Sequence, residues 1–364
     1  MKLNLTRPTL LIDEKKCLQN IKTMLNKARK NNVIFRPHFK SHQSYEIGNW
    51  FKKYGVNKIT VSSVKMASYF ANHGWDDITI AFPVNIPEVR LINNLAKKTN
   101  LNLLIESIDV ISYLDKQITN PVGIYIKVDT GYHRAGIDYS HTSKIKEIIK
   151  KLKISKYLSI KGLLTHSGHT YKAKSVGEIT SIYLDTVYKL QMLRNNLHQA
   201  EKINISVGDT PSMSVIEKFD GIDEIRPGNF VFYDLMQNIL GVCSSDQIAV
   251  ALASPIVSKN KERMELIIYG GAIHLSRESL IDEHGNPFYG CLVELRDKDW
   301  GAPHYDCYVK SISQEHGIVK VSEDLFEKLK LGDFIGILPV HSCLTVNLMK
   351  EYITLEGNKI SVMK

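Results

Sequence analysis

The stretch "VIFRPHFKSHQ", residues 33–43, indicates the fold, because it joins a short apolar run to a basic cluster. The run at 33–35 is typical of a buried strand, and Arg36, His38 and Lys40 follow it at every second position. Alternate side chains of an extended chain share a face. These three basic groups should therefore lie on one side of the strand, at its carboxyl end.

Similar apolar, β-branched runs recur through the first two thirds of the chain. They are TLLID, VIFRPH, KITVSS, DITIAF, LNLLIE, GIYIKVD, IKGLLTH, INISVG and EIRPGNF. Stretches with helical spacing separate them, for example 18–25 and 182–190. This alternation is typical of parallel βα units, and about eight units over roughly 235 residues fit a closed (β/α)8 TIM barrel of the α/β class. An open, doubly wound sheet is the alternative.

The pattern changes after about Gly241. The runs QIAVALASPIVS, RMELIIYGGAI, CLVELR and HYDCYVKSIS follow with few helical stretches between them, which favours a mostly antiparallel β domain. Near the end we expect one short helix capped by Ser322 and then a final pair of strands. The predicted domains are a barrel over 1–241 and a β domain over 242–364.

The composition excludes several classes of protein. The chain has 364 residues, of which 43% are hydrophobic, enough for two domains with separate cores. The apolar runs are too short to cross a membrane, and residues 1–8 lack the apolar middle of a signal peptide, so we expect a cytoplasmic protein. The net charge of +9 is spread over lysines rather than gathered in one basic arm, which argues against nucleic-acid binding. The five cysteines are scattered, so we expect reduced, mostly buried thiols rather than disulfides.

The basic cluster suggests chemistry at Lys40. Residues at the carboxyl end of a barrel strand face the active-site mouth. Crowding by Arg36 and His38 would disfavour the ammonium form of Lys40, and a neutral amine is the nucleophile that forms Schiff bases. A basic surface loop, or a phosphate site without chemistry, fits the same spacing and stays open.

A second candidate site lies near the end of the chain. His341 and Cys343 are two residues apart, so on a strand they would share a face about 7 Å apart along it. An imidazole and a thiolate suit zinc better than magnesium or calcium. A pair with this spacing is also common by chance.

Several motifs together resemble one family. "RPHFKSHQ" is similar to the "RPHxKTHK" segment of the D-serine dehydratase and D-threonine aldolase family, whose fold is that of the alanine racemases, a pyridoxal phosphate barrel followed by a β domain. The resemblance extends from "TRPTLLIDEKKCLQNI" to "HSCLTVNLM", nearly the whole chain. It implies that Lys40 carries pyridoxal 5'-phosphate covalently and acts in catalysis.

The same resemblance assigns further cofactor contacts. "VDTGYHRAG" is similar to the family's "VDTGxxRxG" and implies that Arg134 faces the cofactor ring. "THSGHTY" resembles a segment of the dehydratase branch, which implies that His166 and Tyr171 bind the cofactor and that His169 and Tyr171 act in catalysis. In "SVGDTP" this chain has Asp209 where the family has serine. The phosphate contacts we expect are Gly208, Thr210, Gly228 and Asn229.

The resemblance also favours one metal and one reaction. "HSCLTVNL" is similar to the dehydratases' "HxCLTVNL", whose His and Cys bind zinc, whereas the aldolase branch has Asp at the position of Cys343. Zinc at His341 and Cys343 is therefore expected, and Mn²⁺ and Mg²⁺ stay open. The implied reaction is dehydration of D-serine, or of a related 3-hydroxy D-amino acid, to a 2-oxo acid and ammonia by a homodimer. The alternatives are D-threonine aldolase and a non-catalytic pyridoxal phosphate carrier.

Overall fold

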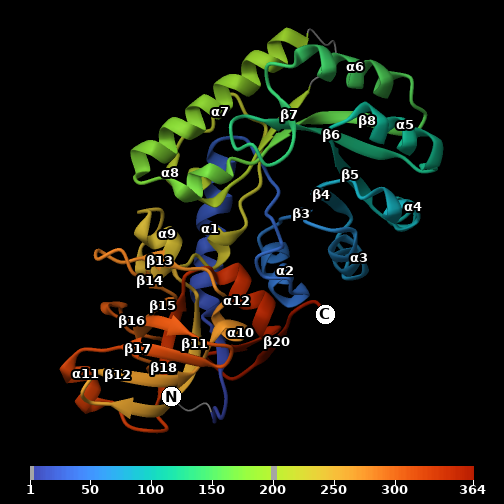
Figure 1. The fold of residues 1–364 in the computed structure, drawn as a ribbon. Helices are drawn as coiled ribbons and strands as arrows, with labels where there is room; N and C mark the ends of the chain where they lie inside the picture. Colours follow the sequence, from blue (N-terminus) through green and yellow to red (C-terminus); the bar gives the residue numbers. More distant parts are fainter. Residues whose placement is uncertain (1–3, 198–202) are drawn as a thin grey trace. The chain divides into compact units, whose positions relative to one another are not determined.

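The computed structural model describes residues 4–197 and 203–364, so the very start of the chain, where we expect no signal peptide, lies partly outside the described residues. The chain divides into two compact units (Figure 1). The barrel unit comprises Lys22–Lys40 and Gly48–Gly228. The β unit comprises Met1–Ile21, Ser41–Ile47 and Asn229–Lys364. None of the helices in the described residues is long and apolar enough to cross a membrane.

The barrel unit is built on a parallel sheet with the order β2-β10-β9-β8-β6-β5-β4-β3. The strands are β2 (Ile34–Phe35), β3 (Lys58–Val61), β4 (Asp77–Pro83), β5 (Asn100–Ile105), β6 (Val122–Asp129), β8 (Leu158–Thr165), β9 (Asn204–Val207) and β10 (Glu224–Ile225). A parallel bridge between His38 and Thr60 joins the two ends of this path. Two backbone hydrogen bonds of 2.9 Å, Thr60 N to Pro37 O and Phe39 N to Thr60 O, support the closure. The predicted eight-stranded barrel is thus confirmed.

Helices connect the barrel strands. They are α1 (Glu14–Lys30) and α2 (Tyr45–Lys53), which each contribute residues to both units, and α3 (Val64–Asn72), α4 (Val89–Ala96), α5 (Ile108–Gln117), α6 (Thr142–Lys153), α7 (Val176–Leu197) and α8 (Thr210–Val215). Serine N-caps begin α3 and α5, where Ser63 and Ser107 accept backbone N–H groups of the first turn. On α6 the three isoleucines and the one leucine are buried, and four of the five lysines are exposed. In Figure 1, α6 and α7 lie on the outer side of β6 and β8.

The β unit contains a second sheet with the order β12-β17-β16-β15-β18-β11-β1-β19-β20. Its strands are β1 (Thr9–Ile12), β11 (Val250–Asn260), β12 (Glu265–Tyr269), β15 (Gly290–Val293), β16 (His304–Ile312), β17 (His316–Lys320), β18 (Phe334–Pro339), β19 (Glu351–Thr354) and β20 (Lys359–Ser361). Because β12 also pairs with β11, the first six strands of this path close into a small antiparallel barrel. Short elements complete the unit, namely α9 (Leu235–Ile239), α10 (Ala272–Leu275), the hairpin β13 (Leu280–Ile281) and β14 (Pro287–Phe288), α11 (Glu323–Lys328) and α12 (Ser342–Met349).

Two predictions about this division are corrected. The run TLLID is not a barrel strand, because β1 pairs antiparallel with β11 and parallel with β19 in the β unit. Each unit is also built from more than one stretch of the chain, so a single boundary at Gly241 does not describe them. The remaining eight runs are the eight barrel strands. Ser322 caps α11 as predicted, with its Oγ accepting the Leu325 N–H.

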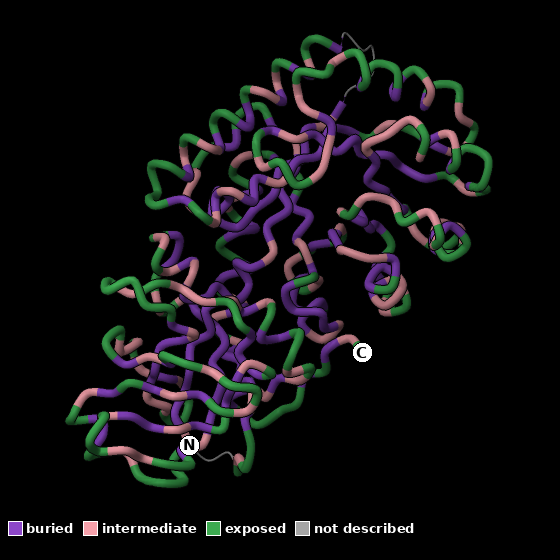
Figure 2. The backbone as a smooth tube through the Cα atoms, in the orientation of Figure 1, coloured by how far each residue is buried: buried purple, intermediate pink, exposed green. Residues whose placement is uncertain are grey.

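Each unit buries its own core. Figure 2 shows buried backbone along the strands of both sheets and exposed backbone on the outer turns of helices and in loops. In the β unit, side chains of the small barrel such as Leu252, Ile268, Leu292 and Val309 are fully excluded from solvent. All five cysteines are free thiols and four are buried, in agreement with the prediction, while Cys343 is half-buried.

Candidate active site

The basic cluster after β2 is divided between two environments. Arg36 is buried, and its guanidinium makes ion pairs with Glu224 (Nε–Oε2, 2.7 Å) and Asp77 (Nη1–Oδ1, 2.5 Å). Lys40 is exposed. The expectation that Arg36 crowds Lys40 at the barrel mouth is therefore wrong, because two carboxylates of the barrel interior neutralise the guanidinium.

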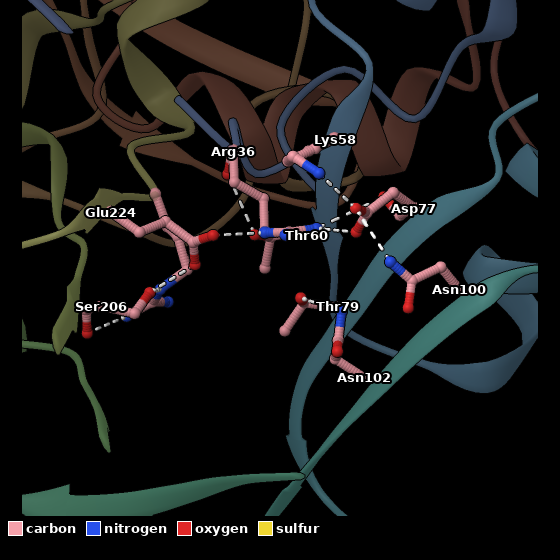
Figure 3. A network of polar contacts seen from close by, with 10 residues as sticks. Arg36, Lys58, Thr60, Asp77, Thr79, Asn100, Asn102, Ser206 and Glu224 are labelled. Atoms are coloured by element: carbon pink, nitrogen blue, oxygen red, sulfur yellow. Dashed lines mark hydrogen bonds and ion pairs between the residues drawn. The ribbon is translucent and has the colours of Figure 1, made fainter. Parts of the chain in front are cut away.

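These ion pairs are part of a network inside the barrel (Figure 3). Asp77 also binds the Lys58 ammonium at 2.6 Å and the Asn100 amide at 3.2 Å, while Glu224 accepts the Ser206 hydroxyl at 2.6 Å. The network ties β2 to β10 on one side and to β3, β4 and β5 on the other. It fixes the backbone four residues before Lys40.

Phe39 fixes the backbone directly beside Lys40. Its side chain is fully buried, and its ring centroid lies 5.0 Å from that of Phe51 and 4.9 Å from those of Phe70 and Trp75. Aromatic rings at these distances attract one another beyond the burial of their area. Lys40 therefore extends from a backbone that is held firmly at residue 39.

Lys40 and His166 lie within electrostatic reach of each other. The pKa of His166 is well below its ordinary value, first because the ring is buried and second because the positive charge of Lys40 disfavours its protonation. His166 follows β8, and its Nδ1 lies 2.5 Å from the carbonyl oxygen of Gly208. Both residues follow barrel strands, Lys40 after β2 and His166 directly after β8.

The loop after β6 is held by Asp129. Its carboxylate accepts the backbone N–H groups of Gly131, Tyr132 and His133 at 2.9 to 3.1 Å. Burial raises the pKa of Asp129, but these hydrogen bonds outweigh it, and the pKa lies below its ordinary value. Arg134 is exposed and its guanidinium carbon lies 5.1 Å from the centre of the Tyr132 ring.

The loop after β8 carries the remaining expected side chains. His169 and Tyr171 lie in a 3₁₀ helix, Gly168–Lys172. The Tyr171 hydroxyl accepts the backbone N–H of Thr210 at 3.2 Å. Among the described residues no group hydrogen-bonds to the buried Nδ1 of His169. This loop therefore connects to the segment expected to hold phosphate.

Three of the four expected phosphate contacts lie together. The Gly228 N–H points to the Thr210 hydroxyl at 3.4 Å, and Gly208 packs so closely on Arg226 that a Cβ would lie 2.9 Å from its carbonyl oxygen. Asn229 belongs to the β unit, where its side-chain amide donates to Asp234 (2.7 Å) and to Ser342 (3.0 Å). The side-chain N–H groups of Asn229 are therefore engaged, and its backbone N–H is the donor left for the expected role.

Asp209 turns away from these contacts. It is the N-cap of α8, and its Oδ1 accepts the Ser212 N–H at 2.7 Å and the Thr170 hydroxyl at 3.1 Å. Its burial raises the pKa to about 6, although these hydrogen bonds and Arg226 act in the opposite direction. The carboxylate that replaces the family's serine thus serves as a helix cap.

His341 and Cys343 come together on a helix rather than on a strand. His341 is the N-cap of α12 and Cys343 is its second residue, which corrects the prediction of a strand. The helix begins here because Asp234 accepts the Ser342 N–H at 3.0 Å, a contact no local pattern reveals. Burial lowers the pKa of His341, but Cys343, Asp234 and Glu278 outweigh it and raise the pKa to about 9.

The donor set around this pair is small. The described residues contain no group of three or more His, Cys, Asp or Glu side chains arranged to hold a metal ion. The buried Nδ1 of His341 finds no hydrogen-bond partner in the described part of the chain, and the Cys343 thiol lies 3.3 Å from the Ser41 hydroxyl. An imidazole beside a thiol suits zinc chemically.

Two groups of the barrel mouth were missed by the sequence analysis. Lys127 is buried at the end of β6, and its pKa is lowered to about 7, first by burial and then by Arg226 and Arg134. A lysine inside the apolar run GIYIKVD was a signal that could have identified it. Tyr132 contacts three of the expected site residues, but in the sequence it occupies a position at which the family motif is unspecified.

The chain matches two family models in order. Residues 12–235 match the model "Alanine racemase, N-terminal domain", and residues 249–355 match "Putative serine dehydratase domain". The D-serine dehydratase of Dictyostelium discoideum is 29% identical, over 96% of this chain and 93% of that protein.

Solved structures show the same architecture. The D-threo-3-hydroxyaspartate dehydratase of Delftia sp. HT23 has a TM-score of 0.90 and 24% identity, over 99% of this chain and 98% of that one, and one structure of a mutant of this enzyme is described as metal-free. The D-threonine aldolase of Filomicrobium marinum has a TM-score of 0.81 and 19% identity, over 98% and 95%. The chain therefore belongs to the family with the alanine racemase N-terminal domain and has the alanine racemase-like fold, in the branch that carries a serine dehydratase domain.

Proposed function

We propose that the protein dehydrates D-serine, or a closely related 3-hydroxy D-amino acid, with pyridoxal 5'-phosphate and zinc. The products are a 2-oxo acid and ammonia. The dehydratases among its relatives support this reaction type. The observation that carries the proposal is the meeting of His341 and Cys343 at the start of α12, because the family's aldolase branch is expected to have Asp in place of the cysteine.

The residues of the barrel mouth fit pyridoxal phosphate. Lys40 offers an exposed amine within electrostatic reach of His166. Gly208, Thr210 and Gly228 form a compact group of small residues, of the kind that binds a phosphate through backbone N–H and hydroxyl groups. When bound, the cofactor supplies an electron sink for the charge that develops at the substrate Cα.

The chain's own groups then have distinct tasks. Lys40 removes the proton from the substrate Cα, as an amine held at the barrel mouth. Arg134 is the residue proposed to face the cofactor ring, and His169 and Tyr171 are candidates for proton transfer to the departing group. The released enamine hydrolyses in water to the 2-oxo acid and ammonia.

His341 and Cys343 would hold the zinc ion. Their imidazole and thiolate match its preferred ligands, and the buried Nδ1 of His341 has no hydrogen-bond partner among the described residues. Zinc would supply Lewis-acid help to the departure of the β-hydroxyl. Ser41, whose hydroxyl lies 3.3 Å from the Cys343 thiol, is bonded in the chain to Lys40.

Product analysis tests the reaction directly. The purified protein is incubated separately with D-serine and with D-threonine, with Lys40→Ala as the inactive control. Pyruvate and ammonia from D-serine support dehydration, while glycine and acetaldehyde from D-threonine would favour the aldolase. If neither substrate is consumed but the cofactor is bound, the carrier alternative gains support. A homodimer, also part of the proposal, is tested by light scattering of the eluting protein.

A further inference from the structure

One aromatic ring contacts three of the proposed site residues. The Tyr132 ring is stacked on His169, with a centroid distance of 5.9 Å and an interplanar angle of 25°. It meets His166 edge-on, at 6.0 Å and 82°, and the Arg134 guanidinium carbon lies 5.1 Å from its centre. Such aromatic and cation–π contacts are directional, so the ring restrains the orientation of each partner.

The backbone holds this ring firmly in place. Asp129 accepts the N–H groups on both sides of Tyr132 as well as its own. Gly131 and His133, the two neighbours of Tyr132, have positive φ angles of 126° and 55°. The tyrosine therefore projects from a tight turn with a fixed geometry rather than from a pliable loop.

Gly168 accommodates the ring on the neighbouring loop. A Cβ built on Gly168 would lie 2.4 Å from Cε1 and Cζ of Tyr132 and 2.8 Å from its hydroxyl oxygen. The three nearest atoms all belong to Tyr132, and the φ angle of Gly168 lies outside the left-handed range. The glycine is thus required by the tyrosine ring and not by its own backbone conformation.

We propose that Tyr132 is a positioning residue that sets the orientation of Arg134, His166 and His169. Residue 168 is a glycine because any larger side chain there would clash with the Tyr132 ring. The inference rests on the proposed function, because these three residues are proposed to serve the cofactor. It goes beyond that function because it states that one side chain, Tyr132, joins the loops after β6 and β8 and so fixes the geometry of the site before any ligand binds.

A double-mutant cycle tests the pair. The variants are Tyr132→Ala, Gly168→Ala and the double variant, and the measured quantity is the dissociation constant for pyridoxal phosphate from its absorbance. Each single variant should weaken binding by about fivefold to tenfold, the size of lost aromatic and cation–π contacts. The double variant should bind no more weakly than Tyr132→Ala, because the added methyl group then meets no ring.

Two further variants separate positioning from general damage. Tyr132→Phe keeps the ring and should bind the cofactor within about twofold of the wild type. Tyr139→Ala is the matched control, because Tyr139 also lies near the end of this loop but its ring faces Lys189. It should leave cofactor binding unchanged. Equal losses in Tyr139→Ala and Tyr132→Ala would overturn the proposal.

A second readout does not depend on the cofactor. In protein with isotope-labelled histidine and glycine, the ring signals of His169 and the Hα signals of Gly168 should shift in Tyr132→Ala and keep their positions in Tyr132→Phe. If the wild type binds no pyridoxal phosphate, the proposed function fails, and these signals still decide the role of Tyr132. Unchanged signals, or a Gly168→Ala penalty that persists in the Tyr132→Ala background, would refute it.

Discussion

Asp209 is a buried carboxyl group, and its replacement by asparagine should stabilise the barrel unit at neutral pH. The side chain is 2% exposed, caps α8 and accepts the Thr170 hydroxyl through Oδ1. Its Oδ2 is buried, with no hydrogen-bond partner among the described residues. Asparagine keeps an acceptor oxygen for the cap and removes the buried charge.

The magnitude follows from the pKa of Asp209. Burial raises this pKa from an ordinary 3.8 to about 6, despite the hydrogen bonds from Ser212 and Thr170. A difference of about 2 units at about 1.4 kcal/mol per unit gives a penalty of roughly 3 kcal/mol for ionised Asp209 in the folded state. The pKa of Asp209 is higher in the folded state than in the unfolded state, so the protonated acid stabilises the folded state. This contribution to the free energy of unfolding is fully present below pH 3.8 and is lost as the pH rises through about 6.

Urea unfolding at two pH values measures this effect. The free energy of unfolding of Asp209→Asn, minus that of the wild type, should be larger at about pH 7 than at about pH 4 by roughly 2 kcal/mol. Asp209→Ser is the control, since serine also caps helices but does not titrate, and it should show the same change with pH. A difference between variant and wild type that is equal at both pH values would refute the reasoning.

Three further predictions concern the barrel and the metal. Arg36→Met leaves Asp77 and Glu224 buried without their shared counter-charge, and should lower the free energy of unfolding by about 3–5 kcal/mol in urea; an unchanged midpoint would contradict the ion-pair network. Phe39→Ala removes a fully buried ring and should lower the free energy of unfolding by about 3–5 kcal/mol in the same measurement. Cofactor binding should also weaken, because the backbone beside Lys40 becomes less firmly held. Chelation should abolish activity on D-serine and added zinc should restore it, and Cys343→Ala should lose the metal by elemental analysis; retained metal in that variant would exclude the thiol as a ligand.

The barrel was predictable because each of its strands has a recognisable pattern in the local sequence. Short β-branched runs separated by helical spacing mark the eight barrel strands, β2 to β6 and β8 to β10, and the change of pattern marks the antiparallel strands. The first run, Thr9–Ile12, has the same local character, yet its partners are β11 and β19. A four-residue run carries no information about which distant strand it pairs with, and so its sheet could not be predicted.

Part of the geometry of the candidate site could not be predicted from the sequence. The motifs after the barrel strands do gather Lys40 with His166 and Gly208 with Thr210 and Gly228. The helix at His341 was missed because Asp234, distant in sequence, caps it. The ion pairs of Arg36 depend likewise on carboxylates from other strands. Contacts of this kind arise only when the chain closes on itself.

Lys40 is proposed to be the amine that binds the cofactor, but the barrel contains a second candidate amine. Lys127 is buried in the same barrel, and its pKa of about 7 keeps much of it neutral at physiological pH. Borohydride reduction of the protein with bound pyridoxal phosphate, followed by peptide mass spectrometry, locates the labelled lysine. We expect the label on the peptide that contains Lys40, and its loss in Lys40→Ala; a label on Lys127, or none on any lysine, would show that Lys40 is not this amine.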